Sequence, residues 1–166
     1  MLSAHPFTAG IEKSVLVRMA AYAHEVTFAP DQVVFGAGER SLHFGLLLSG
    51  SACVELSTPF YGMTIQILSA GDAFGWSALL DENSTVFQVR ARETTRALCF
   101  DGRRLARACA RDRRLSAVVY RHLAEVLAKR VRAVELRLEE FAGSPDRCHE
   151  RGTLPSPGEH TTPAAL

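Results

Sequence analysis

The spacing of apolar residues changes character twice along this chain of 166 residues. Near the N-terminus, Ile11, Val15 and Met19 recur at helical spacing, and they predict a helix over residues 9–23. Between residues 25 and 100, short runs of Val, Leu, Ile and Phe alternate with Gly, Asp and Ser, a pattern typical of an all-β sandwich or roll. The predicted strands lie near residues 25–29, 32–35, 43–49, 51–57, 63–69, 72–74, 86–92 and 95–100.

The pattern becomes helical again after residue 100. An arginine-rich segment predicts a short helix over residues 102–110, and a break at Arg111-Asp112 separates it from a long helix over about 113–141. The apolar stripe along the long helix consists of Tyr120, Leu123, Leu127, Val131, Val134, Leu138 and Phe141. So long a stripe has to bury against the β body or against the same helix of a second subunit, and we expect a parallel homodimer through residues 115–141.

Composition and charge narrow the range of functions. Apolar residues make up 47% of the chain and charged residues 22%, which is ordinary for one soluble globular domain. The net charge of +1 gives no long-range attraction to nucleic acid or to anionic lipid. We expect the domain to span residues 5–141, and residues 143–166, rich in Pro, Gly, Ser and Thr, to form a disordered tail.

The sequence favours a cytoplasmic protein. It holds no apolar run of membrane-spanning length and no basic N-terminal segment followed by an apolar one, so we expect neither a membrane span nor a secretion signal. The four cysteines form no Cys-x-x-Cys pair, which fits a reducing compartment. Cys148-His149 has no further ligands at zinc spacing, so we interpret it as part of the tail and expect no metal site there.

Four glycine turns occur in an order that matches a known family. They are Gly38-Glu39, Ser49-Gly50, Gly71-Asp72 and Gly75. With the helices that follow, these turns resemble the cyclic-nucleotide-binding domain family over residues 5–141. The resemblance implies a mainly β fold, a jelly-roll-like β-roll sandwich with an N-terminal helix and a long C-terminal helix. It also implies a regulatory domain that senses a small molecule.

The resemblance also places the family's phosphate-binding cassette. The residues it assigns to the ligand site are Phe74, Gly75, Trp76, Ser77, Ala78 and Leu79, then Thr85 and Val86 at the end of the loop, and Val134 near Glu135 on the long helix. In such a cassette a short helix begins just after the glycine, so its free backbone N–H groups face the phosphate. In members that bind cyclic AMP, a glutamate after the glycine binds the ribose, and an arginine at the end of the loop pairs with the phosphate.

Both of these ligand-binding side chains are absent. Trp76 occupies the glutamate position and Thr85 the arginine position. The arginine–phosphate contact alone is worth roughly 1.5–3 kcal/mol, so the resemblance implies an altered ligand rather than a plain cyclic AMP sensor. Arg90 is a candidate replacement, and its alternative is an outward, solvated strand face. Trp76 is either an aromatic wall of the pocket or a plug that fills it, and we favour the plug.

Other functions compete with the sensor. If the pocket is vestigial, the chain is a dimerising protein-interaction module whose working surface is the long helix. A transcription regulator is a weaker alternative, because the residues after Phe141 are too few and too rich in Pro and Gly for a helix-turn-helix. The arginines between residues 103 and 114 are better interpreted as a solvated or partner-docking face than as a nucleic-acid site.

Enzymatic activity is not expected. The β region offers only His24 and His43 as metal-binding histidines, without a His-x-His pair, and Ser77 has no base close in the sequence. We therefore assign no catalytic residue and no metal. The only small molecule that we expect is a cyclic nucleotide or another small effector.

Overall fold

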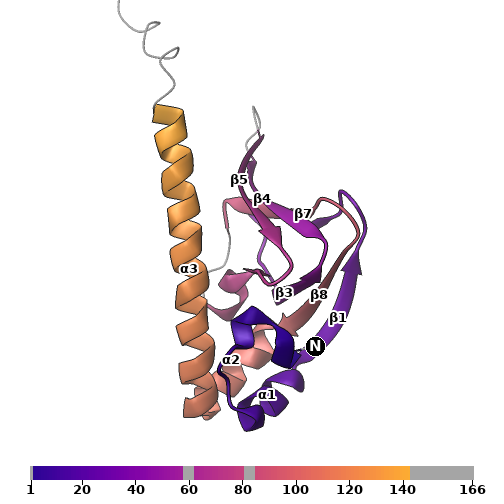
Figure 1. Ribbon diagram of the computed structural model, residues 1–166, viewed down its shortest axis with the longest axis vertical. Helices are drawn as coiled ribbons and strands as arrows, with labels where there is room; N and C mark the ends of the chain where they lie inside the picture. The colour runs from indigo at the N-terminus through magenta and orange to yellow at the C-terminus, as the bar shows by residue number, and fades with distance from the viewer. Residues whose placement is uncertain (1, 58–61, 81–84, 143–166) are drawn as a thin grey trace, which may run out of the picture.

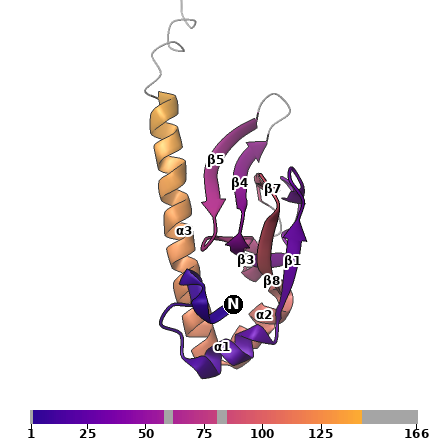
Figure 2. The same ribbon diagram turned by 45° about the vertical axis from the view of Figure 1, so that its right-hand side comes forward.

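The computed structural model describes residues 2–57, 62–80 and 85–142, and within them it shows a sandwich of two antiparallel four-stranded sheets (Figures 1 and 2). The strands are β1 (Ala23–Phe28), β2 (Val33–Phe35), β3 (His43–Ser49), β4 (Ser51–Ser57), β5 (Gly62–Ser69), β6 (Ala73–Phe74), β7 (Phe87–Ala91) and β8 (Thr95–Asp101). The first sheet has the order β1-β8-β3-β6 and the second the order β2-β7-β4-β5. The predicted fold class is confirmed.

Along the described part of the chain, three of the helices come before the first strand, one lies between β6 and β7, and two follow the last strand. They are η1 (Leu2–Ala4), η2 (Pro6–Thr8), α1 (Lys13–Ala20), η3 (Trp76–Leu79), α2 (Gly102–Arg111) and α3 (Arg113–Ala142). The predicted N-terminal helix over residues 9–23 was too long at both ends. Gly10 has a left-handed backbone with φ of 74°, and β1 already begins at Ala23, so only eight residues remain helical.

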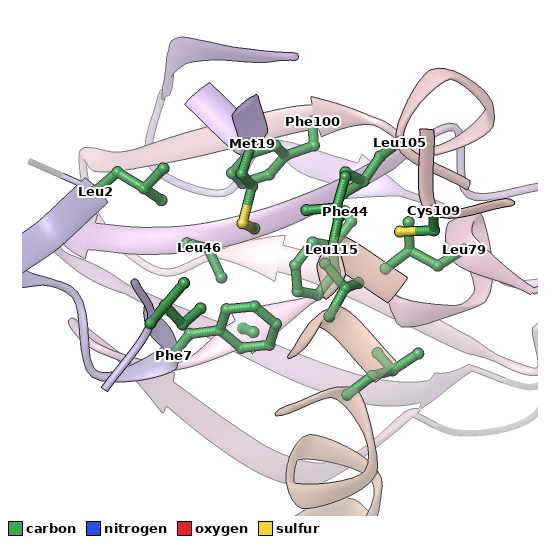
Figure 3. Close-up of a cluster of buried hydrophobic side chains, with 14 of the residues drawn as sticks. Leu2, Phe7, Met19, Phe44, Leu46, Leu79, Phe100, Leu105, Cys109 and Leu115 are labelled. Carbon is green, nitrogen blue, oxygen red and sulfur yellow. The ribbon is translucent and has the colours of Figure 1, made fainter. Parts of the chain in front are cut away.

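Strands β3 and β8 of the first sheet carry buried side chains on both faces, and alternation along these strands divides them between two cores. On one face, Phe44, Leu46 and Phe100 pack against helical residues such as Leu105 and Leu115, as Figure 3 shows. On the other face, the core between the two sheets is built from Phe28, Leu47, Ala52, Val54, Leu68, Phe74, Val89, Ala91, Ala97 and Cys99. The first of these two clusters, which we call the helical core, holds α2 and α3 against the sandwich. Helix η3 contacts both α2 and α3.

Helix α3 runs along the whole molecule, with α1 and α2 at its N-terminal end (Figures 1 and 2). The carboxylate of Asp112 caps its first turn, because one oxygen accepts hydrogen bonds from the backbone N–H groups of Arg114 and Leu115. The other oxygen forms an ion pair with Arg18 of α1 at 2.8 Å. These contacts fix the break that the sequence predicted between the two C-terminal helices.

The two halves of α3 differ in burial. Leu115, Val119 and Leu123 belong to the helical core, whereas Val131 is 56% exposed and Leu138 is 61% exposed. The apolar stripe predicted from the sequence is therefore covered only over its first half within one subunit. The predicted tail over residues 143–166, with Cys148-His149, lies outside the described residues. No helix in the described part of the chain is long and apolar enough to cross a membrane.

Candidate functional site

The cassette forms at the junction of β6 and η3. Gly75 has φ of 68°, a left-handed conformation that turns the chain from the strand into the short helix. A Cβ atom at this position would lie 2.1 Å from the carbonyl oxygen of His43 on β3. The sequence interpretation gave this glycine the task of leaving room for a ligand. In the structure, the close approach of β3 already requires glycine here.

Helix η3 is held from two sides. Leu79 is buried in the helical core, and Trp76 packs against the same core while remaining partly exposed. At the start of α2, a Cβ atom on Gly102 would lie 2.4 Å from the carbonyl oxygen of Ala78, so the two helices touch through their backbones. The cassette is thus in direct contact with the helices that follow the sandwich.

The end of the cassette loop is fastened by the early Gly-Glu turn. The backbone N–H of Gly38 donates a hydrogen bond of 2.7 Å to the carbonyl oxygen of Thr85. The Thr85 hydroxyl oxygen accepts a second hydrogen bond, of 3.2 Å, from the backbone N–H of Phe87. Glu39 closes the turn itself, because its carboxylate accepts a hydrogen bond of 2.8 Å from the N–H of Gly36. These hydrogen bonds therefore fix the position of Thr85 at the end of the cassette.

The cassette surrounds a cavity of about 20 Å³, which we call the cassette cavity. Its residues are Phe35, Val54, Phe87 and Val89 of the second sheet, Gly75, Trp76 and Ser77 of the cassette, Thr85, and Arg130 of α3. A single water molecule needs roughly 10–15 Å³, so side chains fill nearly all of the space. Trp76 is one of several groups that fill it, together with Arg130 and the apolar side chains of the second sheet.

Arg130 is the charged member of this cavity. It is only 8% exposed, and its Nε and Nη1 atoms have no hydrogen-bond partner among the described residues. Burial lowers the pKa of Arg130 to about 10, and the nearby carboxylate of Asp72 opposes that shift. Because this pKa remains well above neutral pH, the guanidinium group stays charged. The site therefore contains a buried positive charge, two of whose nitrogen atoms have no hydrogen-bond partner in the part of the chain that the structure describes.

A second cavity, of about 80 Å³, lies on the other side of Arg130 between α3 and β5, and we call it the β5 cavity. Asp72, Glu125, Lys129 and His122 line it. Gln66 of β5 lines it too, and its buried Oε1 atom has no hydrogen-bond partner in the described part of the chain. Arg130 thus lines both the cassette cavity, whose lining is mostly apolar, and the β5 cavity, whose lining includes several charged side chains.

The structure brings some of the predicted site residues together and separates others. Gly75, Trp76, Ser77 and Thr85 line the cassette cavity. Phe74 is buried between the sheets, and its ring lines a separate cavity of about 360 Å³ beside His24 and His43. Ala78 and Leu79 face the helices instead.

The remaining three predicted residues lie outside the cassette cavity. The Val86 side chain is 63% exposed. Arg90 follows the alternation of β7 away from the buried residues, and its Nε atom pairs with a Glu55 carboxylate oxygen at 3.3 Å. Val134 is partly buried on α3, one turn beyond Arg130. The candidate replacement arginine at position 90 is thus engaged in an ion pair elsewhere.

Sequence reasoning missed Arg130, because it belongs to no cassette motif and lies in a helix with many charged residues. One signal was available. Arg130 follows Val126 by four residues, and Val126 follows His122 by four, so all three share one face of α3. All three line the β5 cavity, and Arg130 also lines the cassette cavity.

The described cysteines have no sign of reactivity. Cys53, Cys99 and Cys109 are all buried. Burial raises the pKa of each thiol to about 11, with the Glu55 carboxylate adding to the effect at Cys53 and Asp112 at Cys109. Among the described residues, no three His, Cys, Asp or Glu side chains gather in a way that would hold a metal ion.

A β sandwich whose cassette opens toward a long C-terminal helix defines a class of small-molecule-binding regulatory domains. A family profile described as the cyclic nucleotide-binding domain matches residues 25–112 of this chain. The chain therefore belongs to the cyclic nucleotide-binding domain family. No curated protein sequence matches it significantly.

Solved structures share the fold. A Geobacter metallireducens GS-15 protein, described as cyclic nucleotide-binding, has a TM-score of 0.70 and 23% identity over 78% of this chain and 95% of its own. The Thermus thermophilus catabolite activator protein has a TM-score of 0.66 and 22% identity over 82% of this chain and 63% of its own. The regulator CLP of Xanthomonas campestris has a TM-score of 0.68 and 14% identity, over 80% of this chain and 66% of its own. At these identities the likeness shows the fold alone.

Proposed function

We propose that this chain is a regulatory domain that binds a small effector at its cassette, with a ligand preference unlike that of the cyclic-AMP-binding members. The observation that carries the proposal is the cassette cavity itself. Gly75, Trp76, Ser77 and Thr85 line it, and a buried charged residue of α3 lies in its wall. A domain without a ligand gains no stability from keeping a charge buried there.

The lining supports a changed preference. Trp76 has no carboxylate for a ribose hydroxyl, and Thr85 has no positive charge for a phosphate. The cavity of about 20 Å³ is also far too small for a nucleotide, so a ligand of that size has to displace Trp76 or Arg130. The CLP regulator, which shares the fold, is described as c-di-GMP responsive, so this fold accommodates ligands other than cyclic AMP.

A thermal-shift panel tests the proposal. The full chain is heated with cyclic AMP, cyclic GMP and cyclic di-GMP, each against sodium chloride of matched ionic strength. A ligand present at about 100 times its dissociation constant stabilises the folded state by roughly 2.7 kcal/mol, which raises the melting temperature by several degrees. We expect at least one of the three to do so. An unchanged melting temperature with all of them would contradict an effector of the cyclic-nucleotide class.

The exposed second half of α3 favours an additional role in self-association. Val131 and Leu138 are seven residues apart, so they share a face, and both are more than half exposed. Of the dimer surface predicted over residues 115–141, Leu115, Val119 and Leu123 are buried within the subunit and are not available to a partner. We infer that a parallel homodimer forms through the part of α3 beyond Leu123. This surface is also the one that a dimerising interaction module would use.

Light scattering of point variants tests the dimer. Leu138→Lys places a charge in the proposed interface, so we expect the mass to fall from that of a dimer to that of a monomer. Leu136→Lys is the matched control, because Leu136 is 53% exposed but lies off the face shared by Val131 and Leu138. A monomeric wild type at high concentration would rule out the dimer.

The proposed activity is binding rather than catalysis, and it involves no metal.

A further inference from the structure

Among the residues that the structure describes, Arg130 alone lines both the cassette cavity and the β5 cavity. The side chain is 8% exposed, and two of its three guanidinium nitrogens have no hydrogen-bond partner among the described residues. A guanidinium group carries five N–H donors and remains charged in proteins. A buried charge in this condition destabilises the folded chain unless a group beyond the described residues pairs with it.

The two cavities differ in the charges that surround Arg130. Two acidic side chains, Asp72 and Glu125, line the β5 cavity together with Lys129, so apart from Arg130 the charged lining is more negative than positive and disfavours an anion. The described lining of the cassette cavity contains no acidic side chain, and it includes the hydroxyl-bearing residues Ser77 and Thr85. An anion that pairs with Arg130 is therefore favoured on the cassette side. Water molecules suffice to fill the side that faces Asp72.

We propose that Arg130 binds the anionic group of the effector and supplies from α3 the positive charge that the cassette lacks at Thr85. The chemical class is a phosphoryl oxyanion, because the planar guanidinium fork matches phosphate oxygens and neighbouring hydroxyl groups donate to the same oxygens. This inference rests on the proposed function, namely that the cassette binds an effector.

The β5 cavity gives Arg130 room to make way for the phosphoryl group, whereas the rest of a nucleotide also requires Trp76 to move, because the cassette cavity holds only about 20 Å³. Arg130 separates the two cavities, and its side chain has rotatable bonds along its whole length. The β5 cavity, of about 80 Å³, provides room for part of this side chain to withdraw. Withdrawal joins the two spaces while the guanidinium group stays beside the cassette. The phosphoryl group then pairs directly with a residue of α3, so ligand binding and the position of that helix are coupled through one contact.

Calorimetry with matched ligands tests this assignment. The probes are cyclic GMP and guanosine, which share a base and sugar but differ in the phosphate, with cyclic AMP and adenosine as a second pair. They are titrated into the full-length wild type, Arg130→Gln, Arg130→Lys and Arg90→Gln. Arg90 is the matched control, because it is an arginine that pairs with Glu55 outside the cavity.

We expect the wild type and Arg90→Gln to bind the phosphorylated member of at least one pair more tightly than its nucleoside. Loss of one charge-assisted contact corresponds to about 10- to 100-fold in affinity, so Arg130→Gln should lose this preference and leave nucleoside affinity unchanged. Arg130→Lys, which keeps the charge without the fork, should lose part of it. Equal loss for nucleotide and nucleoside, or no loss, overturns the role of Arg130 and leaves the effector function intact. A wild type that binds none of the probes overturns the effector function and this inference with it.

Discussion

Replacing Arg130 by methionine should stabilise the protein in the absence of ligand. Burial lowers the pKa of Arg130 to about 10, which lies about two to three pH units below the ordinary value of a guanidinium group. One pH unit corresponds to about 1.4 kcal/mol, so the folded state carries a penalty on the order of 3 kcal/mol for keeping this charge. Because the folded-state pKa is the lower of the two, the whole penalty is present at neutral pH.

Methionine removes the charge and keeps an unbranched apolar side chain of similar reach. Lost packing offsets part of the gain, so we expect the free energy of unfolding to rise by about 1–3 kcal/mol and the melting temperature by roughly 4–10 °C. Urea unfolding followed by circular dichroism measures the change. Lys129→Met, on the exposed neighbouring position, should stay within about 0.5 kcal/mol of the wild type. A loss of more than about 1 kcal/mol for Arg130→Met would refute the view of Arg130 as an unpartnered charge.

Three further predictions concern residues that hold the cassette, the buried core and the start of α3 in place. Gly75→Ala should cost about 3 kcal/mol or more, because its Cβ would meet the carbonyl oxygen of His43, whereas Gly38→Ala, with open space around it, should cost about 1–2 kcal/mol in thermal unfolding. The three buried cysteines have pKa values raised to about 11, so in the native protein they should react with a thiol reagent at pH 8 far more slowly than in denaturant. Hydrogen bonds from the first turn of α3 hold the pKa of Asp112 below its ordinary value, so its stabilising effect should be full above about pH 4 and lost as the pH falls through the lowered value. The stability difference between the wild type and Asp112→Asn should accordingly shrink in acid.

The sandwich was predictable because each strand is bounded by residues that break it. Turns at Gly38, Gly50 and Gly71 all have positive φ, and β3, β4 and β8 begin or end within two residues of the predicted bounds. The long helix was also predictable, since a stripe of apolar residues over about six turns has no β interpretation. Local composition alone decides these elements.

The N-terminal segment and the contents of the cavity depend on tertiary contacts instead. The N-terminal helix was predicted too long because its apolar spacing continues past the point where Gly10 and the pairing of Ala23 with Phe100 end it. The spacing to Val126 places Arg130 on the same helix face as His122, but its burial comes from β5 and the cassette, which the sequence does not place against α3. A charged residue in a helix is normally solvated, and only the packing of α3 against the second sheet makes this one an exception.

The central claim is that a small effector enters the cassette, and the emission of Trp76 tests it most directly. Trp76 is the only tryptophan in the chain and lines the cassette cavity, so the tryptophan emission comes from that site. Titration with cyclic AMP, cyclic GMP and cyclic di-GMP should produce a saturable change in emission with at least one ligand, at the concentrations that raise the melting temperature. A ligand that raises the melting temperature but leaves Trp76 emission unchanged, or three ligands that change neither, would contradict the claim.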